Sequence, residues 1–396
     1  MSAMKPRLLL FSHICSPTFV TGAEKLLLLF ARACVQRFDC VMIVPREGAI
    51  ADRARALGMR VRVLDIPLCL PLYIASPRAA EEVEAHKKHP AWSHLTALLM
   101  EERPSYVAVN TSVHPLPAMA ATALGIPTIW ILMETIMDSP HRKASAELIA
   151  NNCTIIAGIS HSTLLPFHGT SGMSKAIVLT PYLDKEELQE STWPLHRAQT
   201  RRHFGWGGDA RVVGMLAATI YPNKGLEQFV RAMIQIGSAD ARARFLVAGN
   251  PVDEEYYAAC QELAAKSGHG SKFGWLRFAE QVESVYPALD IVVVPSLMAE
   301  GFGMTALEGM AFGKPVVAFA SGGLTEILMA TGNESLLVPT GDVAGLATRI
   351  RTLISSDALR EEVGRRNVEM AERAFGYPAF LERLNQLIGM LPPAKQ

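Results

Sequence analysis

The chain has 396 residues, enough for two domains of ordinary size, and 49% of them are apolar while 19% are charged. That balance supplies large buried cores and excludes a disordered chain. The net charge is zero and the pI is about 7.2, which argues against nucleic-acid binding, since nucleic-acid-binding proteins usually carry a basic surplus.

Cysteine usage and the N-terminus both indicate the cytoplasm. No two cysteines form a Cys-x-x-Cys pair and no histidine cluster accompanies them, so we expect free thiols and no metal site. No cleavable signal pattern precedes the first apolar run. The cysteines are Cys15, Cys34, Cys40, Cys69, Cys153 and Cys260.

In the first half of the chain, short β-branched apolar runs alternate with helical segments. This alternation is typical of a doubly wound parallel sheet. The sequence predicts strands at residues 7–12, 39–44, 60–64, 106–110, 128–133, 154–160 and 176–179. It predicts helices at 23–37, 50–57, 79–89 and 117–124, and a proline-rich loop at 67–77.

Two segments of this half raise the question of membrane contact. Residues 110–133 contain no Asp, Glu, Lys or Arg, which suits a membrane span, but Pro115, Pro117 and Pro127 interrupt them. We therefore interpret them as a strand end, a short helix and a buried strand. The His-Lys-Lys-His run at 86–89 could touch an acidic lipid headgroup, and a solvated helix face is the competing interpretation.

The second half repeats the alternation after a charged linker at 185–206. We expect strands at 211–217, 244–249, 272–276, 290–294, 315–319 and 334–339. We expect helices from 225 to 236, at 254–266, 282–289 and 304–312, from 326 onward, and at 344–355, 359–373 and 378–390.

The loop after the strand at 290–294 carries the clearest chemical signal. Gly301 and Gly303 precede a helix start, where a close backbone approach and free amides favour an anion. Glu300 and Glu308 offer acceptors for hydroxyl groups, such as those of a sugar and a ribose. Two other interpretations stay open. One is a dinucleotide fingerprint from Gly301 to Ala306, and the other is a glycine-rich turn with solvated carboxylates.

The wider pattern resembles a known family. Pro-Ser-x3-Glu-Gly-Phe-Gly-x4-Glu-x2-Ala-x-Gly-Lys-Pro-Val-Val-Ala, followed by Gly-Gly-x2-Glu-Ile, is similar to the signature of the retaining GT-B glycosyltransferases of family 4. The resemblance is close in this segment and looser elsewhere. It implies two Rossmann-like, doubly wound parallel-sheet domains that face a central cleft. Residues 1–184 with the helix 377–396 would bind the acceptor, and residues 185–376 the nucleotide-sugar donor.

The resemblance also implies the activity and its residues. A retaining glycosyltransferase would move a hexose from a nucleotide-diphosphate sugar to a glycan, glycolipid or small-molecule acceptor, without a metal or cofactor. Glu300 and Lys224 would be catalytic. The donor would contact Thr219, Lys224, Asn250, Trp275, Leu276, Glu300, Gly301, Phe302, Gly303, Met304, Thr305, Glu308, Gly322 and Gly323. The acceptor side would include Gly22, His114, Met133 and Glu134. For a lipid-linked acceptor, a peripheral contact with the inner face of the membrane is expected.

Three positions depart from the family pattern. Thr21 stands where a glycine is common, Met133 where a histidine contacts the donor sugar, and Thr219 where an arginine holds the diphosphate. Arg46, Arg142 or Lys314 could replace the lost cation, and His13 or His114 the lost histidine. Several single residues keep a structural alternative: Trp275 as a core aromatic, and Thr21 with Glu24 as a plain helix cap.

The departures support an alternative function, a catalytically impaired GT-B protein that binds a nucleotide or nucleotide sugar as a partner subunit. The retention of Lys224, Glu300 and Glu308 argues against it. An epimerase of the same architecture lacks a suitable set of histidine and carboxylates, and an NAD-dependent oxidoreductase would rest on the glycine pattern alone.

Overall fold

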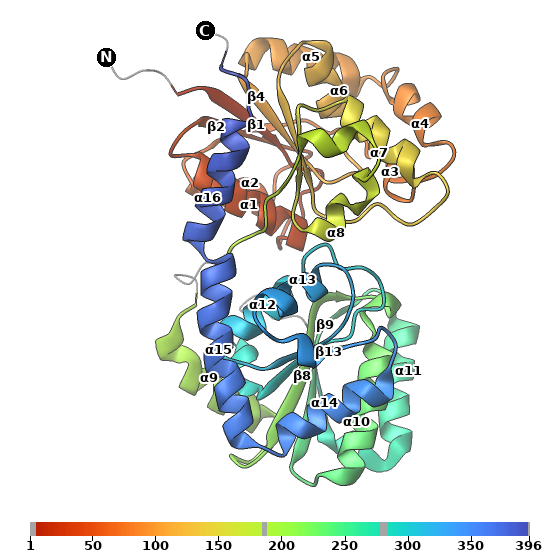
Figure 1. Cartoon of the computed structure of the whole chain (residues 1–396), viewed down its shortest axis with the longest axis vertical. Helices are drawn as coiled ribbons and strands as arrows, with labels where there is room; N and C mark the ends of the chain where they lie inside the picture. The colour runs from red at the N-terminus through yellow and green to blue at the C-terminus, as the bar shows by residue number, and fades with distance from the viewer. Residues whose placement is uncertain (1–4, 184–187, 278–283, 395–396) are drawn as a thin grey trace. The chain divides into compact units, whose positions relative to one another are not determined.

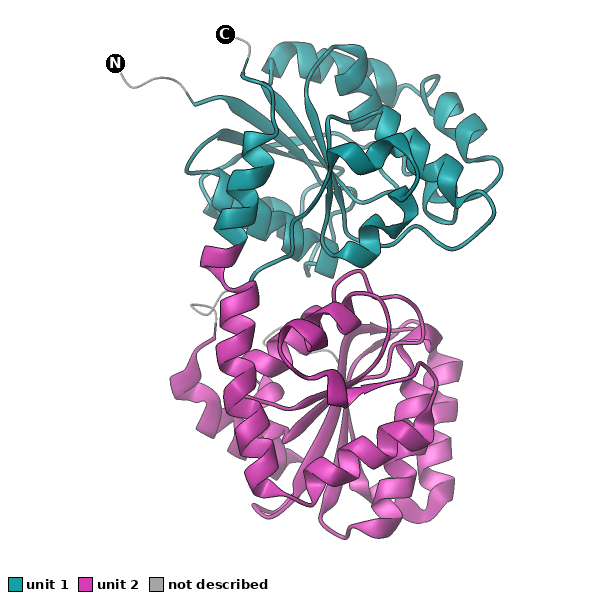
Figure 2. Ribbon diagram, in the orientation of Figure 1, with its two compact units in different colours: residues 1–182, 380–396 teal, residues 183–379 magenta. Residues whose placement is uncertain are grey.

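The computed structural model describes residues 5–183, 188–277 and 284–394, which divide into two compact units. Unit 1 comprises residues 1–182 and 380–396, and unit 2 comprises residues 183–379 (Figure 2). Each unit has its own parallel sheet with helices packed around it (Figure 1). The binding of acceptor by unit 1 and of donor by unit 2 stays a prediction.

Unit 1 contains a seven-stranded parallel sheet in the order β3-β2-β1-β4-β5-β6-β7. Its strands are β1 (Arg7–Phe11), β2 (Asp39–Val44), β3 (Arg60–Val63), β4 (Tyr106–Asn110), β5 (Thr128–Leu132), β6 (Ile155–Gly158) and β7 (Ala176–Val178). The helices are α1 (Gly22–Cys34), α2 (Ala49–Ala56), α3 (Leu70–Tyr73), α4 (Ala79–His86), α5 (Ala91–Glu102), α6 (Pro115–Ala123), α7 (Arg142–Asn151) and α8 (His161–Leu164).

Burial on both faces explains why the central strands of unit 1 are apolar throughout. In β1, Leu9 and Phe11 join a core cluster with residues of α5, α6 and α7, while Leu8 and Leu10 are equally buried. Successive side chains of a strand point to opposite faces, so helices must cover both sides of the sheet. The last helix, α16 (Tyr377–Gly389), returns to this unit and buries Phe380, whose ring lies 4.9 Å from that of Tyr182.

Unit 2 contains a six-stranded parallel sheet in the order β10-β9-β8-β11-β12-β13. Its strands are β8 (Arg211–Ile220), β9 (Ala243–Pro251), β10 (Phe273–Leu276), β11 (Ile291–Val294), β12 (Val316–Phe319) and β13 (Leu337–Val338). The helices are α9 (Trp193–His203), α10 (Leu226–Ala239), α11 (Glu254–Ala264), α12 (Met304–Ala311), α13 (Gly323–Ala330), α14 (Val343–Ile354) and α15 (Asp357–Phe375).

The predicted alternation is confirmed, but several elements were missed or misplaced. The expected linker at 185–206 contains α9, the expected loop at 67–77 contains α3, and α5 and α7 were not predicted. α13 begins at Gly323 rather than at Glu326. Of the helix expected at 282–289, residues 282 and 283 lie outside the described residues, and the rest contains the 3₁₀ turn Tyr286–Ala288 rather than an α-helix.

Residues 110–133 do fold as a strand end, a helix and a buried strand. In the described part of the chain, no helix is both long enough and apolar enough to cross a bilayer. In the run at 86–89, Lys87 pairs with Glu84 at 2.8 Å and the chain is exposed, as a solvated helix end would be.

Candidate active site

The side chains of Lys224 and Glu300 meet at the carboxyl edge of the unit 2 sheet. Lys224 ends the 3₁₀ turn Pro222–Lys224 after β8, and Glu300 lies in the loop between β11 and α12. Their Nζ and Oε1 atoms are 2.6 Å apart, and the two side chains are 32% and 20% exposed. The strand order reverses between β8 and β11, so this pair spans the point where open parallel sheets bind ligands.

Close backbone packing holds Lys224 beside the loop that follows β11. Gly225 has a φ of +76°, and a Cβ atom at this position would overlap with the carbonyl group of Pro295. The amide of Leu297 donates to the carbonyl of Asn223 at 2.8 Å. Position 225 therefore needs glycine both for its left-handed conformation and for space.

A second contact joins the loop after β11 to the loop after β12. Glu300 and Gly322 form an isolated parallel bridge, and the amide of Gly323 donates to the Glu300 carbonyl at 2.8 Å. The hydroxyl of Ser296 donates to Oε1 of Glu300 at 2.5 Å. That oxygen accepts from both Ser296 and Lys224, so the carboxylate is held in one orientation beside the ammonium.

Two helix N-termini start from these joined loops. α12 begins after Gly303, whose φ is +112°, and α13 begins after Gly322, whose φ is +56°. Within the part of the chain that the structure describes, neither N-cap position supplies a side-chain cap, since both are glycines. The first amides of α13 already donate to backbone carbonyls, as Gly323 does to Glu300. Among the described residues, the amides of Met304 and Thr305 at the start of α12 have no such acceptor. Free amides and the helix dipole both attract anions, so Lys224 and the start of α12 make this edge suitable for phosphates. This group takes in the predicted residues Gly301, Phe302, Gly303, Met304, Thr305, Gly322 and Gly323.

Glu308, the fifth residue of α12, is 9% exposed and has a buried tyrosine beside it. The Tyr286 hydroxyl lies 3.1 Å from Oε2 of Glu308 and 3.1 Å from the carbonyl of Thr305, and donates toward these acceptors. Burial raises the pKa of Tyr286 well above its usual range, so the hydroxyl stays a donor. Sequence analysis missed Tyr286, because it lies 22 residues before Glu308 and no local sequence pattern indicates that the two side chains meet.

The other predicted donor residues lie at the carboxyl ends of β8, β9 and β10. Thr219 follows a register shift in β8 and pairs with Asn250 of β9. Trp275 precedes Leu276 at the end of β10 and stacks on Phe273, with ring centroids 5.8 Å apart. Trp275 is half-buried in this aromatic contact, and its stacking on a donor base stays a prediction. Among the described residues, no hydrogen bond or ion pair joins Thr219, Trp275 or Leu276 to Lys224 or Glu300.

A polar cluster lies at the carboxyl edge of the unit 1 sheet, where β1, β4 and β5 are neighbours. Glu134, just after β5, accepts hydrogen bonds from the amide of Ser112 at 2.7 Å and from the Ser112 hydroxyl. Nδ2 of Asn110 lies 3.4 Å from Nδ1 of His13. Burial raises the pKa of Glu134 and lowers the pKa of His13 to about 4. The strand order of unit 1 reverses between β1 and β4, so this cluster also lies at a switch point.

His114 and Met133 are buried in the same region. His114 is 1% exposed, and burial lowers its pKa to about 3, so its ring is neutral at pH 7. Among the described residues, its Nδ1 has no hydrogen-bond partner. Met133 is 8% exposed. His13 and Glu134 are half-buried, so they are the more accessible groups of the region. Roles of His114 and Met133 toward an acceptor stay predictions.

Gly22 opens α1 beside a complete helix cap. The hydroxyl of Thr21 accepts from the amide of Glu24 at 3.4 Å, and the Glu24 carboxylate accepts from the amide of Thr21 at 2.8 Å. These reciprocal bonds form a capping box, so Thr21 and Glu24 act as the plain cap that the sequence left as an alternative. A Cβ atom at Gly22 would have no neighbour within 4 Å.

Comparison with known proteins gives this geometry a family context. Residues 210–356, which include the loops of Lys224, Glu300 and Gly322, match the family model described as Glycosyl transferases group 1. These residues of unit 2 are therefore similar to a group 1 glycosyltransferase domain. Over 285 residues it is 30% identical to D-inositol 3-phosphate glycosyltransferase of Corynebacterium efficiens, a match that covers 69% of this chain and 65% of that protein.

A longer match reaches a second relative. The chain is 25% identical over 349 residues to the GDP-mannose-dependent monoacylated alpha-(1-6)-phosphatidylinositol monomannoside mannosyltransferase of Corynebacterium glutamicum. This match covers 80% of the chain and 89% of the relative. The fold is that of the GT-B glycosyltransferases. HepE of Anabaena, solved with UDP and glucose, superposes with a TM-score of 0.80 at 18% identity, covering 98% of this chain and 100% of HepE.

Proposed function

We propose that the protein transfers a hexose from a nucleoside diphosphate sugar to a hydroxyl group of a glycan, glycolipid or small molecule. The observation that carries the proposal is the Lys224–Glu300 pair at the unit 2 switch point, in the loops that lead into the start of α12. A diphosphate requires positive charge, and sugar and ribose hydroxyls require acceptors. Lys224 and the start of α12 offer the charge, while Glu300 and Glu308 offer the acceptors.

In this mechanism, Lys224 and the first amides of α12 stabilise the charge that develops on the leaving diphosphate. Glu300 orients the hydroxyl groups of the hexose, and Glu308 anchors the ribose. We propose that the anomeric configuration is retained, as the resemblance around Glu300 and Glu308 implies. Because these groups supply the positive charge at the diphosphate, the reaction requires neither metal nor cofactor, and it should continue at full rate in EDTA.

The acceptor is proposed to bind unit 1 near the half-buried His13 and Glu134 at the switch point of that sheet. The names of the two Corynebacterium relatives describe an inositol phosphate acceptor and a phosphatidylinositol mannoside acceptor. A lipid-linked acceptor would bring the protein to the inner face of the membrane. A cytoplasmic location fits the six buried, unbridged cysteines, since free thiols persist in a reducing compartment.

Thermal unfolding with nucleotides tests donor binding first. The purified protein is heated with UDP, GDP, ADP, UDP-glucose, UDP-N-acetylglucosamine, GDP-mannose or NAD. A ligand that binds the folded state raises the midpoint, and one base should give the largest rise. Lys224→Ala should abolish this rise. Lys266→Ala removes a 74% exposed lysine elsewhere in unit 2 and should leave it unchanged.

Hydrolysis of the matching sugar donor then separates an enzyme from a binding protein. Slow release of free hexose, lost in Lys224→Ala, supports transfer. If the protein binds the donor but neither hydrolyses it nor transfers the sugar to any acceptor, the result favours the alternative of a catalytically impaired partner subunit. The departures at Met133 and Thr219 support that alternative. A response to NAD alone, or to no nucleotide, would reject the donor site.

A further inference from the structure

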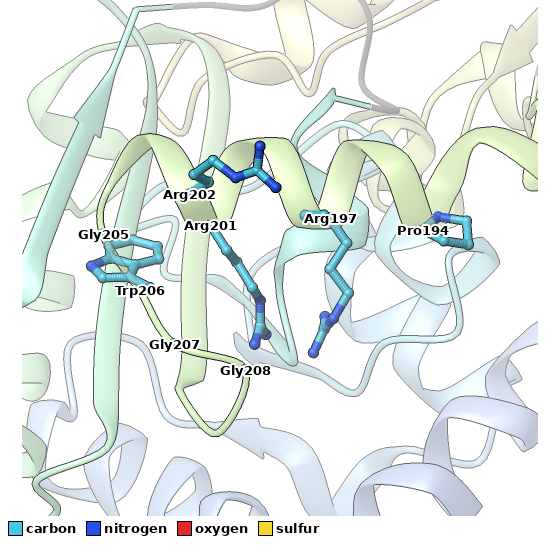
Figure 3. A pocket seen from close by; sticks show the side chains of 9 residues that line it. Pro194, Arg197, Arg201, Arg202, Gly205, Trp206, Gly207 and Gly208 are labelled. Carbon is cyan, nitrogen blue, oxygen red and sulfur yellow. The ribbon is translucent and has the colours of Figure 1, made fainter.

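Two cavities flank α9 at the amino-terminal edge of the unit 2 sheet. One, of about 560 Å³, is lined by Arg197, Arg201, Arg202, Trp206 and the glycines around it (Figure 3). Figure 3 shows Arg197 and Arg201 leaving α9 in the same direction, with Arg202 directed away from them. The other, of about 270 Å³, is lined mostly by charged residues: Arg197, Arg211, Asp290, Lys314, Asp357, Arg360 and Glu361, besides Gly313 and Pro315.

The smaller cavity lies far from the donor site. Arg211 begins β8, and Lys314 lies just before β12, whereas Thr219 and Lys224 follow at the carboxyl ends. Eight residues of strand from Arg211 to Thr219 span roughly 26 Å. Lys314 therefore lies at the opposite edge of the sheet, and its expected role as a substitute for the cation lost at Thr219 is wrong.

Two arginine–carboxylate–arginine groups meet at this cavity. Asp290 accepts from Arg197 at 2.8 Å through Oδ1 and from Arg201 at 2.8 Å through Oδ2. Asp357 accepts from Arg211 at 2.8 Å and also from Arg360. Each group has two guanidinium cations for one carboxylate, so each keeps one positive charge that no carboxylate of the group balances.

Lys314 adds a third unbalanced charge. Among the described residues its ammonium has no hydrogen-bond or ion-pair partner. Burial, with repulsion from Arg197, lowers its pKa to about 8, so it is mostly charged at pH 7. Nε of Arg211 is also buried and has no partner among the described residues. Besides Asp290 and Asp357, which are already counted, the only other carboxylate in the cavity lining is that of the exposed Glu361.

We propose that this cavity is a second anion site, which takes a phosphate-sized, multiply charged oxyanion on Lys314 and Arg211. The volume accommodates such an ion, and the three surplus charges come from separate elements, α9, α15 and the starts of β8 and β12. An anion with several acceptor oxygens can use both the Lys314 ammonium and the Arg211 Nε–H. The ligand is free inorganic phosphate or the phosphate group of a small monoester.

The experiment measures thermal midpoints of the full chain with sodium phosphate, with glycerol 3-phosphate and with sodium chloride at matched ionic strength. Phosphate or the ester should raise the midpoint, and chloride should not. Lys224→Met should keep this rise, because the proposed donor site is not involved. Lys314→Met should abolish it, and without phosphate its own midpoint should be equal to or above wild type, because an unbalanced buried charge is gone.

Glu361→Gln tests the anion site without replacing a buried residue. Three carboxylates line the cavity, and arginines pair with two of them, Asp290 and Asp357. Among the described residues, Glu361 has no such arginine partner. Removing its negative charge should therefore let phosphate bind severalfold more tightly. Glu362→Gln, the exposed neighbour that does not line the cavity, should leave the affinity unchanged. Phosphate stabilisation that survives in Lys314→Met but disappears in Lys224→Met overturns the proposal. So does the absence of any midpoint rise above the chloride control.

Discussion

Replacing Glu300 with glutamine should separate binding of the diphosphate from transfer of the sugar. In the ligand-free protein, Oε1 of Glu300 lies 2.6 Å from Nζ of Lys224. A phosphate oxygen that bonds to Nζ from the other side, at about 2.8 Å, would lie roughly 5.4 Å from the carboxylate oxygen. Two unit charges at that separation repel by about 0.8 kcal/mol in water and by about 3 kcal/mol at an effective dielectric of about 20.

The partial exposure of the Lys224 and Glu300 side chains decides which of these two repulsion energies is closer to the real value. With the two side chains 32% and 20% exposed, we expect the lower part of the range, about 1 to 2 kcal/mol. Removing the carboxylate charge should therefore tighten binding of the nucleoside diphosphate about five- to thirtyfold. The sugar loses its charged acceptor in the same variant, so hydrolysis and transfer should fall by about a hundredfold or more.

Isothermal titration with the nucleoside diphosphate, and hydrolysis of the matching sugar donor, measure the two effects separately. Glu255→Gln, an exposed carboxylate of α11, controls for the loss of one charge from unit 2. If Glu300→Gln binds the diphosphate no better than wild type, the phosphates do not lie beside this carboxylate and the assignment of Lys224 fails with it.

Three further predictions concern the stability of the two units. Gly225→Ala should cost roughly 3 kcal/mol or more of unfolding free energy in a urea titration, because of its φ of +76° and its overlap with Pro295. Gly208→Ala, where a Cβ atom meets nothing within 4 Å, should cost less than about 1 kcal/mol; equal losses would contradict the clash. Burial holds the pKa of His114 at about 3, below the unfolded value of 6.5, so the unfolded state binds more protons between these values. Stability from this group is complete above pH 6.5 and falls by about 1.4 kcal/mol per pH unit below it, and His114→Gln should flatten the urea midpoints between pH 5 and 7. Glu102 has a side chain 4% exposed and pairs with Arg7, Arg60 and Arg62, so Glu102→Gln should cost about 3 kcal/mol. Glu101→Gln, at a 63% exposed position paired with Arg62, should cost less than about 1 kcal/mol, and similar losses for both would show that burial is not the cause.

The elements that sequence predicted well are those whose burial is uniform. The central strands of both sheets are covered on two faces, and their apolar runs are visible without any knowledge of contacts. The loop from Gly301 to Gly303 was also predictable, because a helix start with glycines has a local signature.

The features that sequence analysis missed depend on contacts between residues that are far apart in the chain. α9 looked like a linker because of its charge, yet Arg197 and Arg201, four residues apart, both bind Asp290 about ninety residues later. The same holds for Tyr286 beside Glu308 and for Ser112 beside Glu134. The prediction that Lys314 replaces the cation lost at Thr219 was wrong for a related reason. Lys314 is close to the glycine-rich motif in sequence, but it lies at the opposite end of a strand from the proposed donor site. Only strand order and direction reveal which charges share an edge.

The two ends of unit 2 lie beside each other. The amide of Leu183 donates to the carbonyl of Phe375 at 2.9 Å, and Leu183 forms a parallel bridge with Gly376. Topologically, unit 2 is therefore an insertion between residue 182 and residue 380 of unit 1. A contiguous piece, 183–379, can be exchanged with the corresponding piece of a protein of the same fold by cutting at two neighbouring points. Unit 1 permits no such single cut, because a fragment ending at 182 would lose Phe380, Leu384 and Leu387 from its interior. Chimaeras built on this scheme would test the proposal that unit 2 selects the donor and unit 1 the acceptor.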